Sequence, residues 1–441
     1  MSSTELASAP QLPRPGHEPL IPERVKSPRR AVLELVLVVA ALAALAVVSG
    51  TTDIAVIVVC IVAIVMIHEL GHLLAAKHGG MKVTEYFLGF GPRLWSFRRG
   101  ETEYGVKAFP LGGYVKIPGM TNLEEVDPAD EARTYREQPF HARLLVALAG
   151  SAMHFLMAFV LMWALLAFVG LPNNSQVQVQ GLAPIAGHAG PAAEAGLRNG
   201  DILVSVDGRR IGGDATTLTD AIQSHAGRPL TLVVERDGRP VTLRVTPLDG
   251  RTVHEAGVKA PRGTAPFGVI GVSLGSPVAT TNPVHAVGTA VIDLGHFAWA
   301  TVAGVGHLFA PSAIASRFHQ VASAKAAAQA SANGTRVESI VGAVGTGGQA
   351  VAAGLGATLL FLISINLFLG VFNLFPMLPL DGGHVAIAVY EKIRTGSRRV
   401  LYHADVSKLM PFTWVMLAFL GVLFGTSLLN DLLHPMANPF Q

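Results

Sequence analysis

The sequence predicts a polytopic α-helical membrane protein of about five spans, with a membrane-proximal β-rich hairpin and one extracytoplasmic α+β domain. Of its 441 residues, 50% are hydrophobic and only 14% are charged, whereas soluble globular proteins carry about 25% charged residues. Apolar runs of roughly 20 residues recur along the chain, and a helix of this length crosses a bilayer. The composition therefore excludes an ordinary soluble enzyme and a largely disordered chain.

Five apolar runs are long enough to be membrane spans, namely residues 31–49, 54–76, 143–169, 355–374 and 409–429. Residues 1–30 are rich in proline, serine and charge, so we expect a disordered cytoplasmic tail. No small-residue cleavage site followed by a polar sequence is present, which argues against a secretory signal peptide. The first run is the weakest span because Glu34 interrupts it, and it could instead lie on the membrane surface.

The distribution of lysine and arginine predicts how the spans are oriented. These residues gather in three segments, which are 1–30, 77–143 and 385–408. Because short loops rich in Lys and Arg stay inside, we expect these segments in the cytoplasm and residues 170–354 outside the cell membrane. The net charge of +3 is too small to indicate a nucleic-acid partner.

Residues 175–250 predict a compact outer domain of strands and short helices. Glycine, proline and charge become more frequent there, and two β-branched runs, Leu230–Glu235 and Val241–Thr246, flank Asp237-Gly238. Asp-Gly between two such runs is a strong hairpin signal.

Residues 251–354 are expected to link this outer domain to the next span. Within them, residues 284–310 are apolar but interrupted by Asp293 and three histidines. We therefore expect a helix that lies in the membrane interface rather than a sixth span. The remaining segments are predicted as a span with its polar cluster (355–384), a cytoplasmic loop (385–408) and a last span with its tail (409–441).

A polar cluster inside the span 54–76 carries the chemistry. Here His68-Glu69-Leu70-Gly71-His72 places two histidines one helical turn apart, with a glutamate beside them. Zinc held by protein ligands with one open position lowers the pKa of its bound water to about 7, and Glu69 could accept the proton. Such a short motif also occurs by chance, but each ionisable group near the bilayer centre costs about 2.5–3.5 kcal/mol, and a metal would compensate.

A second polar cluster supplies a third ligand. Pro376 and Pro379 interrupt the helix before Asp381, which in lipid is tolerated only where protein or a wet cavity satisfies the backbone. Asp381 is the only carboxylate there, and it completes a His-His-Asp set. Asn373 could hydrogen-bond a bound peptide or a developing oxyanion; the alternative for Asn373 and Asn366 is hydrogen bonding between helices.

These motifs together resemble the site-2 protease family of intramembrane zinc metalloproteases, in the bacterial type that contains a PDZ domain. The similar segments are His68–His72, Gly89–Pro92, Asn373–Pro376 and Leu380–His384, and the resemblance extends over residues 55–430. It implies a four-span catalytic core in the bacterial plasma membrane.

The resemblance also implies the roles of the site residues. His68, His72 and Asp381 become ligands of Zn²⁺, and Glu69 becomes the general base. The implied reaction is the cleavage of single-span membrane proteins within the membrane, typically of an anti-sigma factor that another protease has already cut outside. Such regulated proteolysis releases a sigma factor.

Two further segments are candidates for holding the substrate. Strand-like residues 93–117 lie in the loop 77–142, and the resemblance implies that this β-rich loop re-enters the membrane. An extended substrate could add to the edge of its strands; the alternative is a plain cytoplasmic sheet without substrate contact. Pro191–Leu197 and Asn199–Gly208 resemble a PDZ domain, which would bind peptide termini. Because the Gly-Leu-Gly-Phe loop that binds the terminal carboxylate is absent, a size filter for substrates is equally compatible with this sequence.

Two alternative functions remain open at this point. A catalytically silent PDZ scaffold predicts the loss of a site residue, yet all four are present. A zinc hydrolase acting on a non-peptide membrane substrate would share the same site. The other histidines of the spans, His78 and His154, are expected to cap or pack, whereas His384 could support Asp381 or begin a helix.

Overall fold

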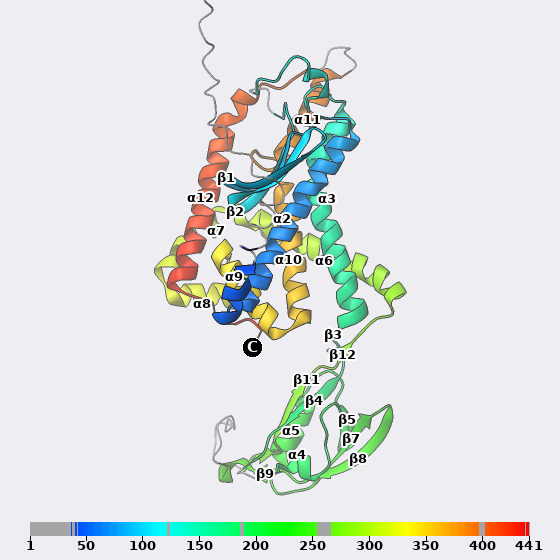
Figure 1. Cartoon of the computed structure of the whole chain (residues 1–441). Coiled ribbons are helices and arrows are strands. Elements are labelled where there is room, and N and C mark those ends of the chain that lie inside the picture. Colours follow the sequence, from blue (N-terminus) through cyan, green and yellow to red (C-terminus); the bar gives the residue numbers. More distant parts are fainter. Residues whose placement is uncertain are drawn as a thin grey trace, which may run out of the picture. The chain divides into compact units, whose positions relative to one another are not determined.

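The computed structural model describes residues 37, 40–41, 43–120, 124–185, 189–253, 266–396, 402–436 and 438–440. The chain divides into two compact units, and Figure 1 labels the helices and strands of both. The first unit lies within residues 1–155, 308–349 and 369–439, and the second within 156–307, 350–368 and 440–441.

Five helices of the described chain are long and apolar enough to cross a membrane, as predicted for a polytopic helical protein. They are α2 (Thr52–His78), α3 with its π-helical end (Phe140–Val169), α6 (Pro283–Leu308), α10 (Leu355–Asn373) and α12 with the turn before it (Val406–Leu433). Four of them coincide with runs that the sequence predicts as spans. About half of the predicted span 31–49 lies outside the described residues, which in this run are 37, 40–41 and 43–49.

Helix α6 covers the segment for which the sequence predicts an interfacial helix. It is continuous from Pro283 to Leu308 and passes through Asp293 and His296 without a break. Its length and composition would allow it to cross a membrane, so its interfacial position stays a prediction.

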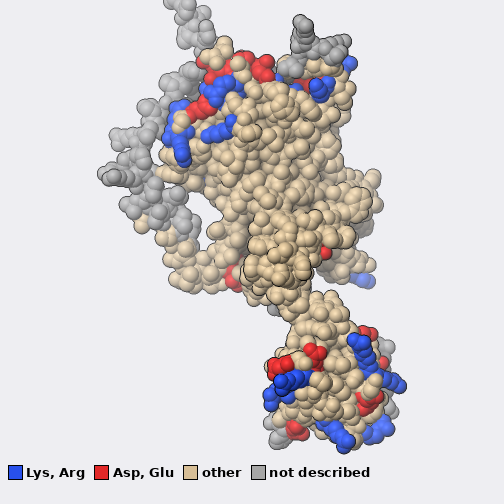
Figure 2. All heavy atoms as spheres, turned by 90° about the vertical axis from the view of Figure 1, so that its right-hand side faces the viewer, with Lys and Arg blue, Asp and Glu red and all other residues tan. Residues whose placement is uncertain are grey.

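The surface of the first unit fits a lipid environment. On the face drawn in Figure 2, most Lys, Arg, Asp and Glu of the helical part lie at one end, a few lie toward the other end, and other residues cover the stretch between. Apolar side chains such as Val59, Leu145 and Trp414 are exposed on its helices. A surface of this kind suits hydrocarbon rather than water.

A β-hairpin follows α2, where the sequence predicts a β-rich loop. Strands β1 (Glu85–Arg99) and β2 (Thr102–Lys116) are joined through Gly100, whose φ of 66° favours glycine. Register shifts fold the two strands back on themselves, so that Tyr86 pairs with both Tyr104 and Val115. The last segment of β2, residues 113–116, pairs on one side only within the described chain.

An ion pair fastens the hairpin turn to the segment that follows it. Arg133, in a short 3₁₀ helix (Glu131–Arg133), donates to both carboxylate oxygens of Glu101 at 2.8 and 2.6 Å. These charged hydrogen bonds lower the pKa of Glu101. This ion pair therefore contributes to holding the turn of the hairpin.

The second unit contains a domain of strands and short helices at the predicted position. Its main sheet has the order β11-β4-β5-β7-β8, with β6 paired to β5. The strands are β4 (Val177–Leu182), β5 (Ile202–Val206), β6 (Arg209–Arg210), β7 (Leu230–Arg236), β8 (Arg239–Val245) and β11 (Val272–Gly275). Two short ladders flank the sheet, β3 (Leu171–Pro172) with β12 (Val278–Ala279), and β9 (Leu248–Asp249) with β10 (Gly268–Val269).

The hairpin expected at Asp237-Gly238 joins β7 to β8. Both residues have positive φ values, 52° and 73°, as a tight hairpin turn requires. Helices α4 (Pro191–Glu194) and α5 (Thr216–Ser224) complete the domain, and Leu218 of α5 is fully buried in its core. This core makes the domain an independent packing unit.

The first unit also contains all or part of four further helices among its described residues. They are α7 (Pro311–Ala322), α8 (Ala324–Ala332), the start of α9 (Ile340–Ala353) and α11 (Asp381–Thr395), while α12 itself begins at Met410. Arg143 of α3 and Glu391 of α11 form an ion pair in which both side chains are buried. Glu391 also accepts a hydrogen bond from the Ala404 amide at 2.6 Å.

We expect the substitution Glu391→Ala to lower the free energy of unfolding by about 3–5 kcal/mol, because it leaves the guanidinium of Arg143 buried without its partner. Thermal unfolding of the purified chain in detergent measures the loss. The control is Glu131→Ala, which removes a surface ion pair with Arg136 and should change the melting temperature little. Equal small effects of both variants would contradict the structural role of the buried pair.

Candidate metal centre

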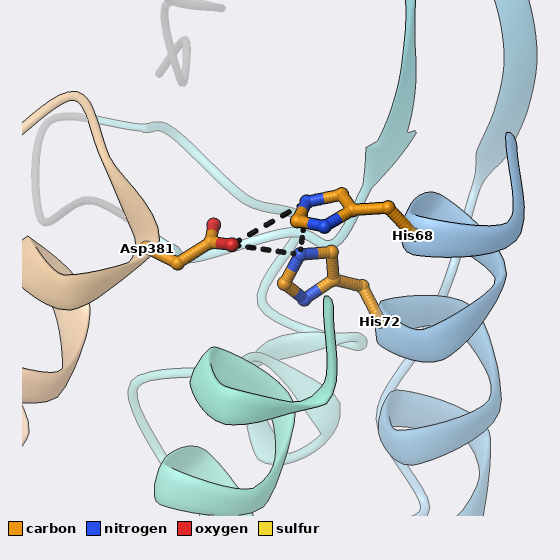
Figure 3. A group of neighbouring side chains, drawn as sticks. All are labelled: His68, His72 and Asp381. Atoms are coloured by element: carbon orange, nitrogen blue, oxygen red, sulfur yellow. Dashed lines mark hydrogen bonds and ion pairs between the residues drawn. The ribbon is translucent and has the colours of Figure 1, made fainter. Parts of the chain in front are cut away.

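Three side chains from distant parts of the sequence meet in the first unit. His68 and His72 lie on successive turns of α2, and Asp381 is the first residue of α11; Figure 3 shows the three side chains pointing toward one another. Their facing atoms are close: His68 Nε2 to His72 Nε2 is 3.2 Å, and Asp381 Oδ2 lies 3.4 and 3.3 Å from these two nitrogens.

The triangle formed by these three atoms fits a zinc ion. Ligands bound to tetrahedral zinc at about 2.0–2.1 Å stand about 3.3 Å from one another, and the three separations of 3.2 to 3.4 Å match this spacing. Asp381 Oδ2 is buried and has no hydrogen-bond donor within the described chain. A buried acceptor of this kind requires a partner, and a shared cation would provide one.

The tautomer of His72 also suits a metal ligand. Its Nδ1 donates to the backbone oxygen of Val146 in α3 at 2.8 Å. Because a carbonyl oxygen can only accept, the ring proton lies on Nδ1, and the lone pair of Nε2 faces the cluster. This bond also fixes the orientation of the ring.

Helix α3 leaves room for the two imidazoles only because residue 150 is glycine. An ideal Cβ on Gly150 would lie 2.4 Å from both His72 Nε2 and His68 Cε1. On the facing helix, an ideal Cβ on Gly71 would lie 2.6 Å from the Ala149 carbonyl oxygen. Small residues at both positions therefore let α2 and α3 approach closely, as is common between membrane helices.

Glycines also set the position of Asp381. An ideal Cβ on Gly382 would lie 2.2 Å from the Leu374 carbonyl oxygen, and one on Gly383 would lie 2.5 Å from the Leu378 nitrogen. The non-helical segment after α10 thus folds directly onto the first turn of α11. This contact requires glycine at positions 382 and 383, because a side chain at either position would push the two backbones apart.

Glu69 lies between the two histidines and beside the hairpin. An ideal Cβ on Gly113 of β2 would lie 3.2 Å from Glu69 Cγ and 2.9 Å from Met66 Sδ. Tyr86 of β1 donates a hydrogen bond to the Met66 carbonyl oxygen at 2.7 Å. The edge segment 113–116 therefore lies against α2 next to the cluster.

The remaining candidates of the sequence analysis are placed as follows. Asn373 is the last residue of α10 and half-buried, and within the described chain its side chain makes no hydrogen bond to the cluster. Asn366 is buried and donates to the Leu362 oxygen of its own helix at 2.9 Å. The ring of His154 packs 4.8 Å from that of His68, and the ring of His384 lies 6.2 Å from Tyr135.

Gly150 is the site residue that the sequence analysis misses. The available signal is the run Ala147-Leu148-Ala149-Gly150-Ser151-Ala152 in the predicted span 143–169, where small residues indicate a close helix contact. This run does not show which helix lies opposite, so it does not identify the histidines as the neighbours.

Comparisons with known proteins place the chain among metallopeptidases. Residues 56–418 match peptidase family M50. The chain is 34% identical over 400 residues to the zinc metalloprotease Rip1 of Mycolicibacterium smegmatis, an alignment that covers 84% of this chain and 95% of that protein. It is 35% identical over 409 residues to Rip1 of Mycobacterium tuberculosis H37Rv, covering 84% and 94% respectively.

We expect Gly150→Ala to lower the zinc content of the purified protein at least about tenfold, because its methyl group would occupy the space of the two imidazoles. Elemental analysis measures zinc per chain. The control is Gly421→Ala in α12, where an added Cβ meets no atom within 4 Å. Full zinc occupancy in a folded Gly150→Ala protein would show that this glycine does not limit the site.

Proposed function

Because this chain belongs to peptidase family M50, we propose that it hydrolyses a peptide bond within transmembrane segments of other membrane proteins. It is a zinc metalloendopeptidase of the site-2 protease type and a multi-pass membrane protein. The observation that carries the proposal is the approach of His68 and His72, on the candidate span α2, and Asp381 of α11 to within 3.4 Å of one another.

Each residue of the site would have a distinct role in peptide hydrolysis. His68, His72 and Asp381 would hold zinc, which when bound supplies a Lewis acid and a water with a pKa of about 7. Glu69, beside the two histidines, would accept the proton from the attacking water and return it to the leaving amine nitrogen. Asn373 would hydrogen-bond the substrate peptide or the oxyanion that develops on its carbonyl.

The edge of the hairpin is the proposed place for the substrate backbone. A peptide bond inside a helix is shielded by its own hydrogen bonds, so the substrate must first become extended. Residues 113–116 of β2 pair on one side only within the described chain, and Gly113 lies beside Glu69. An added strand at this edge would bring an extended segment to the general base.

For the substrates, we propose single-span membrane proteins such as anti-sigma factors that have already lost their outer part. The domain formed by β4 to β11 would lie outside the plasma membrane, as the Lys and Arg distribution favours. It would act as a PDZ-like module that binds the new peptide terminus or as a size filter that rejects substrates not yet cut. Lipid would surround the spans.

The two alternative functions predict different observations. A silent scaffold has no need for donors at zinc spacing, and here these donors are present with an adjacent glutamate. A hydrolase for a non-peptide substrate has no need for an extended-strand edge at the base, which favours the peptide substrate. Analysis of the products separates these cases directly, because only a peptidase yields two peptide fragments.

We expect Glu69→Gln to lower the rate of cleavage of a single-span substrate in vesicles by about 10²–10⁴-fold, because the proton acceptor is lost. Zinc content should stay unchanged. Mass spectrometry of the products gives the rate and the cut position, and Glu125→Gln, an exposed loop residue, is the control. Equal cleavage by the Glu69→Gln and unmodified proteins would overturn the assignment of the base.

We expect Asp381→Asn to reduce zinc per chain, because an amide is a poorer ligand than a carboxylate. His78→Ala serves as the control, since this exposed histidine lies at the end of the same helix as His68. Elemental analysis of both purified variants gives the comparison. Unchanged zinc in Asp381→Asn would remove this residue from the ligand set.

A further inference from the structure

We propose that Phe309 is a positioning residue of the metal centre, because it fixes the segment that carries Asp381. The zinc-retention part of this inference uses only the metal site. Its kinetic part rests on the proposed peptidase function.

Phe309 lies at the centre of a stack of three aromatic rings in the first unit. Its ring is stacked on that of Phe375 at a centroid distance of 4.3 Å and an angle of 7° between the planes. On the other side it meets Phe419 of α12 at 4.6 Å and 19°. Each such pair contributes about 0.5–1.5 kcal/mol beyond the burial of its surface, so the stack holds Phe375 against α12.

Phe375 belongs to the segment 374–380, which packs on the first turn of α11 but whose amides make no long-range hydrogen bond among the described residues. Its amide hydrogen bonds within the described chain are local, such as Phe375 to the Phe372 oxygen at 3.0 Å and Leu380 to the Met377 oxygen at 3.0 Å. Pro376 and Pro379 have no amide hydrogen to donate. The position of this segment therefore depends on side-chain packing, and the Phe309 ring supplies a contact from outside it.

A displacement of Phe375 would reach the metal ligand directly. An ideal Cβ on Gly382 would lie 2.3 Å from the Phe375 carbonyl oxygen. The backbones at Gly382 and Phe375 are therefore in close contact, with no room for a side chain between them. Gly382 follows Asp381, whose Oδ2 lies 3.3 Å from His72 Nε2. A movement of the backbone at Phe375 would therefore move the backbone at Gly382 and, with it, Asp381. A metal ligand displaced by a fraction of an ångström binds less well.

Phe309 is separate in the chain from both elements that it contacts. It follows the last residue of α6, Leu308, and precedes α7, which begins at Pro311. Its contact with Phe375 is therefore a tertiary contact from the connection between these helices. This location distinguishes it from the local residues of the Asp381 segment.

The test measures the rate at which the purified, zinc-loaded full chain loses zinc to an excess of EDTA. We expect Phe309→Ala to lose zinc about 10-fold faster than the unmodified chain. Phe309→Tyr, which keeps the stacked ring, should restore the slow rate. Phe309→Leu keeps most of the volume without the ring and should fall between them. With a peptide substrate, kcat should decrease about 10-fold in Phe309→Ala, while KM changes less than about twofold.

The control is Ile57→Ala, which removes a fully buried side chain from α2 of the same unit. Ile57 lies three helical turns before His68, roughly 16 Å along the helix axis, so Ile57→Ala should lower the melting temperature without accelerating zinc loss.

Zinc loss at the unmodified rate in folded Phe309→Ala would overturn the proposal, as would equal acceleration by Ile57→Ala. If Phe309→Ala does not fold, the rate for Phe309→Leu decides: an unmodified rate overturns the proposal, and a faster rate supports it. An unmodified chain that keeps zinc but cleaves no peptide would contradict the proposed function only.

Discussion

The structure depends on one constraint: three donor atoms that are costly to bury lie together at the spacing of ligands to one cation. His68, His72 and Asp381 are mostly buried, and their facing atoms lie within 3.4 Å of one another. Asp381 Oδ2 and His68 Nδ1 are buried without a hydrogen-bond partner among the described residues, and unsatisfied polar groups are costly in such surroundings. Zinc binding and the packing of α2 against the start of α11 are therefore parts of one equilibrium.

The carboxylate of this centre is supported on both sides along the chain. Before Asp381, the ring of Phe375 is stacked on Phe309. After it, α11 is fastened by the buried ion pair between Glu391 and Arg143 of α3. The histidines are supported differently, since they lie on a continuous helix and His72 is oriented by the Val146 oxygen. The non-helical segment before Asp381 thus needs tertiary contacts to hold its position, whereas the histidines are held by a regular helix.

The sequence predicts the spans and the ligands because both leave local patterns. The span at α2 follows from an uninterrupted apolar run, and the spacing of His68 and His72 follows from the helical turn. Asp381 could be found because it is the only carboxylate beside two helix-breaking prolines. The fit of these three residues to a single ion is a three-dimensional property that the structure adds.

Other features leave no such pattern. A glycine such as Gly150 is common in membrane helices, and only the contact partner reveals its importance. The pairing of Phe309 with Phe375 joins residues that are distant in sequence, and apolar side chains give no indication of their partner. The depth of α6 and the role of Asn373 stay predictions, because neither an apolar pattern nor a half-buried amide determines them.

The space at Gly150 has a consequence for how such proteins are recognised. A homologue could retain every ionisable residue of the motif and still be a pseudoenzyme, if a single methyl group on the neighbouring helix filled the space that the two imidazoles occupy here. Surveys that classify chains by their acidic and histidine signatures would count it as active. The residue at the position of Gly150 would distinguish active enzymes from such pseudoenzymes.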